Sequence, residues 1–157
     1  MTTLPAPLDQ WFAAQGWTLH PHQRDMLARA DNPATLLIAP TGGGKTLAGF
    51  LPTLAELGPQ PPPGLHTLYI SPLKALAADI RRNLRRPVEG AGLNIRIEDR
   101  TGDTTYTQRR RQRADPPHIL LTTPESLALL LSYEDAPRIF AGLARVIVDR
   151  SEERRVG

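Results

Sequence analysis

The sequence of 157 residues contains no cysteine, few aromatic residues and no long apolar run. The absence of cysteine excludes disulfides and thiolate zinc sites, and it fits a reducing compartment such as the cytoplasm. No stretch approaches the roughly 18 apolar residues of a membrane span, so we expect no membrane partner. The N-terminus also lacks the basic flank and apolar segment of a signal peptide. An apolar content of 40% is sufficient for one buried core.

What the sequence does contain is a glycine-rich loop, Ala39–Thr46, directly after the apolar run Leu36–Ile38. Glycines allow backbone N–H groups to turn around a polyphosphate, and a closing Lys-Thr pair supplies a phosphate-binding ammonium and a hydroxyl ligand for Mg²⁺. A helix that starts at the loop would point its positive end at the same anion. The loop therefore predicts binding of a nucleoside triphosphate with Mg²⁺. The residues expected to hold it are Thr41, Gly42, Gly43, Gly44, Lys45 and Thr46.

Short apolar runs alternate with helical patterns along the rest of the chain. Strands are expected over 34–39, 67–70, 94–98, 118–121 and 145–149. Helices are expected over 8–15, 21–30, 45–56, 73–84, 105–113 and 124–132, with a further turn at 136–140. This alternation is typical of βαβ units. The fold class predicted is α/β with a parallel sheet.

Small polar residues follow three of the expected strands: Ser71, Thr123 and Asp149. In open parallel sheets, ligands bind at the edge where the strands end. Each residue taken singly is equally well explained as the N-cap of the next helix. The two roles are compatible, because a helix N-terminus also offers N–H donors to a phosphate.

The positive charge is modest, at +3, but it is unevenly distributed. One arginine run covers 81–86 and another covers 109–113. A solvated helix face is the ordinary interpretation of either run alone. Two such runs in a chain with a phosphate loop suggest a polyanionic partner, most simply nucleic acid.

Five segments occur in the order of the superfamily 2 helicase motifs: Gln23, 39–46, 71–76, 100–104 and 123–127. Over residues 8–149 the sequence resembles the Lhr-like, ligase-associated DEXH-box DNA helicases. The resemblance implies a helical cap at 1–32 and an incomplete RecA-like P-loop NTPase domain at 33–149. It also implies ATP and Mg²⁺ as cofactors and a function in DNA repair. Single-stranded or partly duplex nucleic acid is the implied partner, with DNA favoured over RNA.

The resemblance also assigns roles to single residues. Gln23 would contact the adenine base, and Asp149 would hold Mg²⁺ through water, together with Thr46. A second group would follow the nucleic-acid backbone: Ser71, Lys74, Thr101, Gly102, Thr123 and Pro124. Trp11 and Trp17 are expected to be packing residues of the cap rather than platforms for bases.

One position departs from the family pattern. The residue after Asp149 should be the glutamate that activates water, but Arg150 stands there, and arginine has no acceptor. No catalytic residue is therefore assigned, and residues 150–157 are expected to be a non-native tail. The chain is expected to be truncated after the strand that ends at Asp149, the aspartate of helicase motif II. The second RecA-like domain, which supplies an arginine finger worth about 10³–10⁵ in rate, is expected to be missing.

Three hypotheses follow. The first is the N-terminal part of an ATP-dependent DNA helicase or translocase. The second is a module that binds ATP and nucleic acid without turnover. The third is a P-loop phosphotransferase for a small molecule, which leaves the strand-end motifs unexplained.

Overall fold

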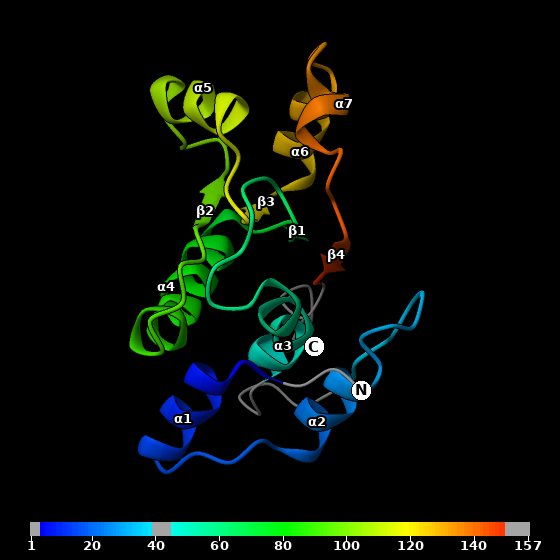
Figure 1. The fold of residues 1–157 in the computed structure, drawn as a ribbon. Coiled ribbons are helices and arrows are strands. Elements are labelled where there is room, and N and C mark those ends of the chain that lie inside the picture. The colour runs from blue at the N-terminus through cyan, green and yellow to red at the C-terminus, as the bar shows by residue number, and fades with distance from the viewer. Residues whose placement is uncertain (1–3, 39–44, 150–157) are drawn as a thin grey trace. The chain divides into compact units, whose positions relative to one another are not determined.

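Strands and helices alternate along most of the chain in the computed structural model, which describes residues 4–38 and 45–149. The chain forms two units, one of residues 1–61 and 84–94 and one of residues 62–83 and 95–157. The elements are α1 (Ala6–Ala14), α2 (Pro21–Ala28), α3 (Lys45–Leu57), β1 (Thr67–Ile70), α4 (Lys74–Gly90), β2 (Ile97–Arg100), α5 (Tyr106–Ala114), β3 (Ile119–Thr122), α6 (Pro124–Leu131), α7 (Ala136–Ile139) and β4 (Arg145–Val148) (Figure 1).

The second unit is built on a parallel sheet of four strands in the order β2-β3-β1-β4. Ile70 of β1 pairs with both Thr122 of β3 and Val148 of β4, and Arg100 of β2 also pairs with Thr122. All four strands therefore end at the same level. The predicted α/β fold with a parallel sheet is confirmed.

Central strands of this sheet are buried, as parallel strands covered on both faces usually are. All of β3 is buried, and so are Thr67, Leu68 and Tyr69 of β1. One apolar cluster of the second unit joins the sheet to α6 and α7. Its buried members are Leu65, Leu68, Leu120, Leu130 and Ile139.

Aromatic side chains organise the first unit. The rings of Trp11 and Trp17 meet edge to face with their centroids 5.3 Å apart, and the ring of Phe12 lies 5.6 Å from that of Trp11. The guanidinium of Arg86 lies 5.3 Å from the centre of the Trp17 ring. Gly90, the last residue of α4, lies directly against Trp11. The two tryptophans therefore pack on each other within the first unit, as expected, and Trp17 remains 42% exposed.

The strand predicted over 34–39 is wrong for residues 34–38, which form neither strand nor helix. Ala39 lies outside the described residues. Leu36 and Ile38 are 83% and 85% exposed, so this apolar run is not a buried strand. A strand needs a neighbour that completes its backbone hydrogen bonds, and the described part of the chain supplies none here.

Two elements have boundaries that differ from the prediction by more than two residues. Helix α4 was expected to end near residue 84, but it continues past Pro87 to Gly90. Leu84 and Val88, one turn apart, are both buried, and this packing outweighs the hydrogen bond that a proline inside a helix removes. The strand expected at 94–98 lies at Ile97–Arg100, where it pairs with β3.

None of the helices in the described part of the chain has both the length and the apolar character to cross a membrane.

Candidate nucleic-acid interface and nucleotide-binding residues

The carboxyl edge of the sheet brings four of the predicted site residues into one row. Because the strands end in register, the next residues follow one another across the edge in the order Thr101, Thr123, Ser71 and Asp149. Backbone hydrogen bonds continue the pairing of β3, β1 and β4 into this row. The Ser71 N–H donates to Thr122 O and the Asp149 N–H donates to Ile70 O, both at 3.0 Å.

The hydroxyl groups in this row shape the turns that follow the strands. Ser71 is fully buried, and its Oγ accepts a hydrogen bond from the N–H of Leu73 at 3.2 Å. Thr123 is the N-cap of α6, where its Oγ1 accepts from the N–H of Ser126 at 3.4 Å. Thr101 is 3% exposed. The capping role weighed in the sequence is therefore present at Thr123, whereas Ser71 holds the turn that precedes α4.

The other predicted contacts with nucleic acid face outward. Gly102 and Pro124 are exposed, and so is Lys74 at the start of α4. The Nζ of Lys74 lies 3.2 Å from Oδ2 of Asp103, with side chains 60% and 74% exposed. Such exposed ion pairs contribute little free energy, so Asp103 holds the Lys74 ammonium only weakly.

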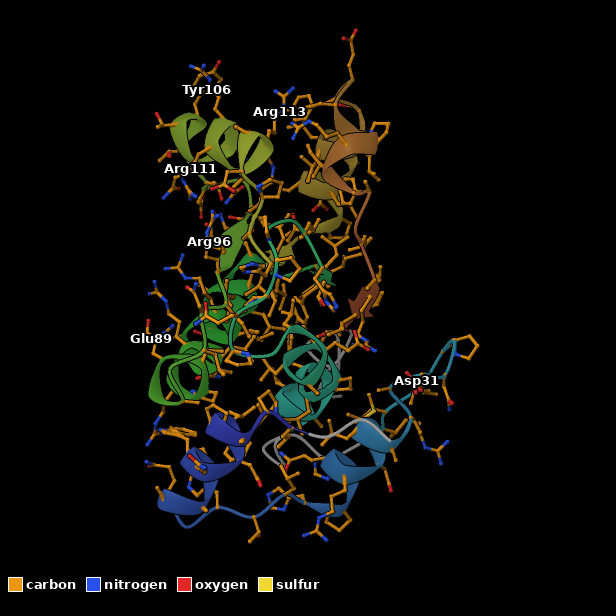
Figure 2. The ribbon with its side chains drawn as sticks, in the orientation of Figure 1. Asp31, Glu89, Arg96, Tyr106, Arg111 and Arg113 are labelled. Carbon is orange, nitrogen blue, oxygen red and sulfur yellow. The ribbon has the colours of Figure 1, made fainter. Side chains whose placement is uncertain are left out.

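Arg96 and Arg111 lie on the flank of β2 and α5 (Figure 2), and both pair with acidic side chains. Arg111 donates to both carboxylate oxygens of Glu98, at 3.0 and 2.8 Å, and Arg96 donates to the same carboxylate at 2.9 Å. Burial alone would raise the pKa of Glu98, but the hydrogen bonds from Arg111 and Arg96 outweigh it. The pKa of Glu98 therefore lies below its ordinary value.

The remaining arginines of α5 also have partners inside the second unit. Arg113 points toward the start of α7 (Figure 2), where it pairs with Asp135 at 3.0 Å. Its guanidinium lies 3.8 Å from the centre of the Tyr133 ring. Arg110 lies 5.9 Å from the ring of Tyr106, which is 75% exposed. The run 109–113 thus serves largely to hold α5 in place.

The run 81–86 follows the same pattern. Arg81 pairs with Asp99 of β2 at 2.7 Å, and Arg82 pairs with Asp79 within α4 at 2.6 Å. Together with the contact of Arg86 on the Trp17 ring, these pairs favour the helix-face interpretation of both arginine runs. The case for a polyanionic partner therefore rests on the edge of the sheet rather than on the arginine runs.

Arg100, at the end of β2, has a structural role that the sequence did not indicate. Its side chain is 1% exposed, and burial lowers the pKa of its guanidinium. Nη1 donates to Arg109 O at 3.2 Å and to Gln112 Oε1 at 3.3 Å. These contacts link β2 to α5 directly behind the loop that carries Thr101 and Gly102.

Tyr69 is a second residue that sequence reasoning missed. Its side chain is 1% exposed, and its hydroxyl donates to Oδ2 of Asp149 at 2.7 Å. The hydrogen bond joins β1 to the residue that follows β4. The sequence signal for it is faint, namely one residue with a hydroxyl in the middle of an apolar strand.

In the first unit, Gln23 lies in the first turn of α2 and is 4% exposed. Its Oε1 accepts a hydrogen bond from the N–H of His20 at 2.8 Å, which closes a capping box at the start of the helix. Helix α3 begins at Lys45 and Thr46, as expected. The predicted phosphate-loop residues Thr41, Gly42, Gly43 and Gly44, like Arg150, lie outside the described residues, and so does the side chain of Lys45.

A parallel sheet with polar residues along its carboxyl edge, in a chain with a Lys-Thr phosphate loop, defines a RecA-like ATP-binding fold. The model of the DEAD/DEAH box helicase family matches residues 20–153. The chain belongs to this family.

The chain is similar to helicases named Lhr. It is 44% identical over 154 residues to the Lhr helicase/probable uracil glycosylase of Mycolicibacterium smegmatis, covering 89% of this chain and 10% of that protein. It is 39% identical over 162 residues to the ATP-dependent helicase Lhr-Core of Methanocaldococcus jannaschii, covering 93% of this chain and 19% of that protein. The solved structure of Mycobacterium smegmatis Lhr bound to ssDNA and AMP-PNP matches with a TM-score of 0.85 and 40% identity. That match covers 96% of this chain and 20% of the other. The chain thus spans between a tenth and a fifth of the length of these relatives.

Proposed function

We propose that this chain is the ATP- and nucleic-acid-binding first part of a DNA helicase or translocase of the Lhr type. The observation that carries the proposal is the row of Thr101, Thr123, Ser71 and Asp149 along one edge of the parallel sheet. The proposed organisation is a cap at 1–32, an incomplete RecA-like domain at 33–149 and a non-native tail at 150–157. The cytoplasm is the proposed compartment, since helicases act where ATP and nucleic acid occur.

ATP is proposed to bind with its adenine at Gln23 and its triphosphate at 41–46. The Thr46 hydroxyl and the Asp149 carboxylate, the latter through water, would hold Mg²⁺. The residues fit this ion, because Asp149 is only half-buried and oxygen donors are what Mg²⁺ prefers. When bound, Mg²⁺ would neutralise part of the negative charge on the β- and γ-phosphates.

Nucleic acid is proposed to run along the carboxyl edge of the sheet. Lys74, Gly102 and Pro124 are exposed there and would contact the backbone directly. The buried hydroxyls of Thr101 and Thr123 would contribute through the turns they hold, which present backbone N–H groups to phosphates. The similarity to a helicase solved with ssDNA supports DNA over RNA, and DNA repair is the process proposed.

One observation favours a second candidate, a module that binds ATP and nucleic acid without turnover. Arg150 occupies the position where the family pattern places the glutamate that activates water, and a guanidinium has no acceptor for a proton. The two candidates differ in hydrolysis and agree in binding.

A binding assay and a turnover assay on the same protein distinguish the candidates. Binding of a fluorescent ATP analogue and ATP hydrolysis would be measured with and without single-stranded DNA. Turnover stimulated by DNA favours the motor, and binding without turnover favours the module. Lys45→Ala should abolish nucleotide binding, whereas Arg82→Ala, which removes one exposed positive charge from α4, should not. Failure of the wild-type chain to bind the ATP analogue would contradict both candidates.

A further inference from the structure

Tyr69 and Asp149 meet on one face of the sheet. Tyr69 of β1 is in register with Ile147 of β4, and Asp149 lies two residues further along the same strand direction. Side chains two residues apart on a strand point to the same face, so Asp149 is the diagonal neighbour of Tyr69. An aromatic side chain spans that diagonal, and the phenol hydroxyl reaches Oδ2 of Asp149 at 2.7 Å.

The surroundings of Tyr69 and the backbone of Asp149 leave both partners of this hydrogen bond little freedom to move. The side chain is 1% exposed in a strand whose neighbours Leu68 and Thr67 are also buried, so the ring has little freedom to move. The Asp149 N–H donates to Ile70 O at 3.0 Å, which fixes the backbone of Asp149 as well. A hydroxyl donating to a carboxylate forms a short, strong hydrogen bond. Asp149 is therefore fixed at two points, its backbone N–H and its carboxylate.

We propose that Tyr69 is a positioning residue for Mg²⁺-nucleotide binding and acts through Asp149. This inference rests on the proposed function, in which Asp149 holds Mg²⁺ through water. The hydroxyl of Tyr69 keeps the carboxylate in the orientation that receives the hydrated ion. The Asp149 side chain therefore loses no further rotational freedom when the ion binds. Partners that orient a metal-binding group in this way typically change metal affinity about 10–100-fold. Because the coordination is through water, we expect a loss near the lower end, about tenfold.

Tyr69→Phe removes the hydroxyl and keeps the ring that packs in the sheet. The affinity for a fluorescent AMP-PNP would be measured once with Mg²⁺ and once with excess EDTA. We expect binding about tenfold weaker than wild type with Mg²⁺ and unchanged binding in EDTA. Tyr106→Phe, on the exposed face of α5, is the matched control and should leave both affinities unchanged. Equal weakening in both conditions, or no weakening in either, would overturn the inference.

A double-mutant cycle tests whether Tyr69 acts through Asp149. If it does, adding Tyr69→Phe to Asp149→Asn should cause no further loss of Mg²⁺ dependence, because the carboxylate is already gone. If Tyr69→Phe still weakened Mg²⁺-dependent binding about tenfold in the Asp149→Asn chain, the inference would be overturned. If the wild-type chain binds AMP-PNP with Mg²⁺ but Tyr69→Phe behaves like wild type, only this inference fails. If the wild-type chain binds no nucleotide, the proposed function fails with it.

A measurement on the wild-type chain provides an independent test in which variants serve only to assign the signals. The chain has 3 tyrosines, Tyr69, Tyr106 and Tyr133, so ring signals labelled with ¹³C are readily assigned by single substitutions. Adding Mg²⁺ to the AMP-PNP complex should shift the Tyr69 signal and leave that of Tyr106 in place. A Tyr69 signal that does not respond to Mg²⁺ would overturn the inference.

Discussion

Replacing Gly90 by alanine tests the packing of the aromatic cluster in the first unit. A Cβ at Gly90 would lie 2.5 Å from Cε2 of Trp11 and closer still to its Nε1. Carbon atoms at optimal contact are about 3.5–4.0 Å apart, so either the indole or the end of α4 must shift. The indole is restrained, because its ring also packs against those of Phe12 and Trp17.

The expected magnitude is the difference between two opposing effects. Overpacking of a well-packed site typically destabilises by about 1–3 kcal/mol. Alanine favours a helix over glycine by about 1 kcal/mol in the interior, and this gain is smaller at Gly90 because it is the last residue of α4. We therefore expect a net loss of about 1–2 kcal/mol in the free energy of unfolding. In a chain of this size that lowers Tm by roughly 2–8 °C.

Tryptophan fluorescence is a direct assay, because Trp11 and Trp17 are the two tryptophans of the chain and both belong to the cluster. Unfolding in urea would be followed by this signal for wild type, Gly90→Ala and Gly142→Ala. At Gly142 a Cβ would lie 3.6 Å from Leu65 O, an ordinary contact, so that variant should be close to wild type. In a Trp11→Leu background the loss caused by Gly90→Ala should shrink. A Gly90→Ala chain as stable as wild type would refute the reasoning.

Three further predictions concern charge, pH and capping. Lys74→Ala should weaken binding of single-stranded DNA and reduce the slope of log affinity against log salt by about one, while Arg82→Ala should leave the slope unchanged. Burial lowers the pKa of His118 below 6.5, and its Nδ1 accepts from the N–H of Arg96 at 2.9 Å. The unfolded chain therefore binds this proton more readily, so unfolding free energy should fall as pH drops below about 6.5. In urea titrations, His118→Gln should reduce the difference in unfolding free energy between pH 7 and pH 5. A difference equal to that of wild type would contradict this role of His118. Thr105→Ala should destabilise the chain by about 1 kcal/mol in thermal unfolding, while Thr105→Ser should retain the cap of α5.

The sequence predicted most elements because their signals are local. Strand β1 has the bounds expected from four apolar or β-branched residues in a row, and α6 begins where Thr123 and Pro124 indicate a cap and a first turn. The alternation of strands with helices indicated a parallel sheet. Of the predicted site residues in the second unit, four fall in one row because parallel strands share a carboxyl edge.

Other features depended on neighbours that no local pattern contains. Leu36 and Ile38 read as a buried strand, yet strand formation requires a second strand, and in the described residues they are exposed. Helix α4 continues past Pro87 because Leu84 and Val88 are buried. Hydrogen bonds across the sheet have no signature in sequence spacing either.

By itself, the sequence determined the chemical inventory: a Lys-Thr phosphate loop, polar residues after the strands, and Arg150 where the family pattern has a glutamate. The tertiary structure decided how those residues are used. It turned the hydroxyl of Ser71 inward to hold the turn before α4, left Lys74 facing outward, and set Tyr69 against Asp149 across eighty positions of the chain. The physical reason is that residue type fixes which hydrogen bonds a side chain is able to make, whereas burial and strand register fix which of them it makes.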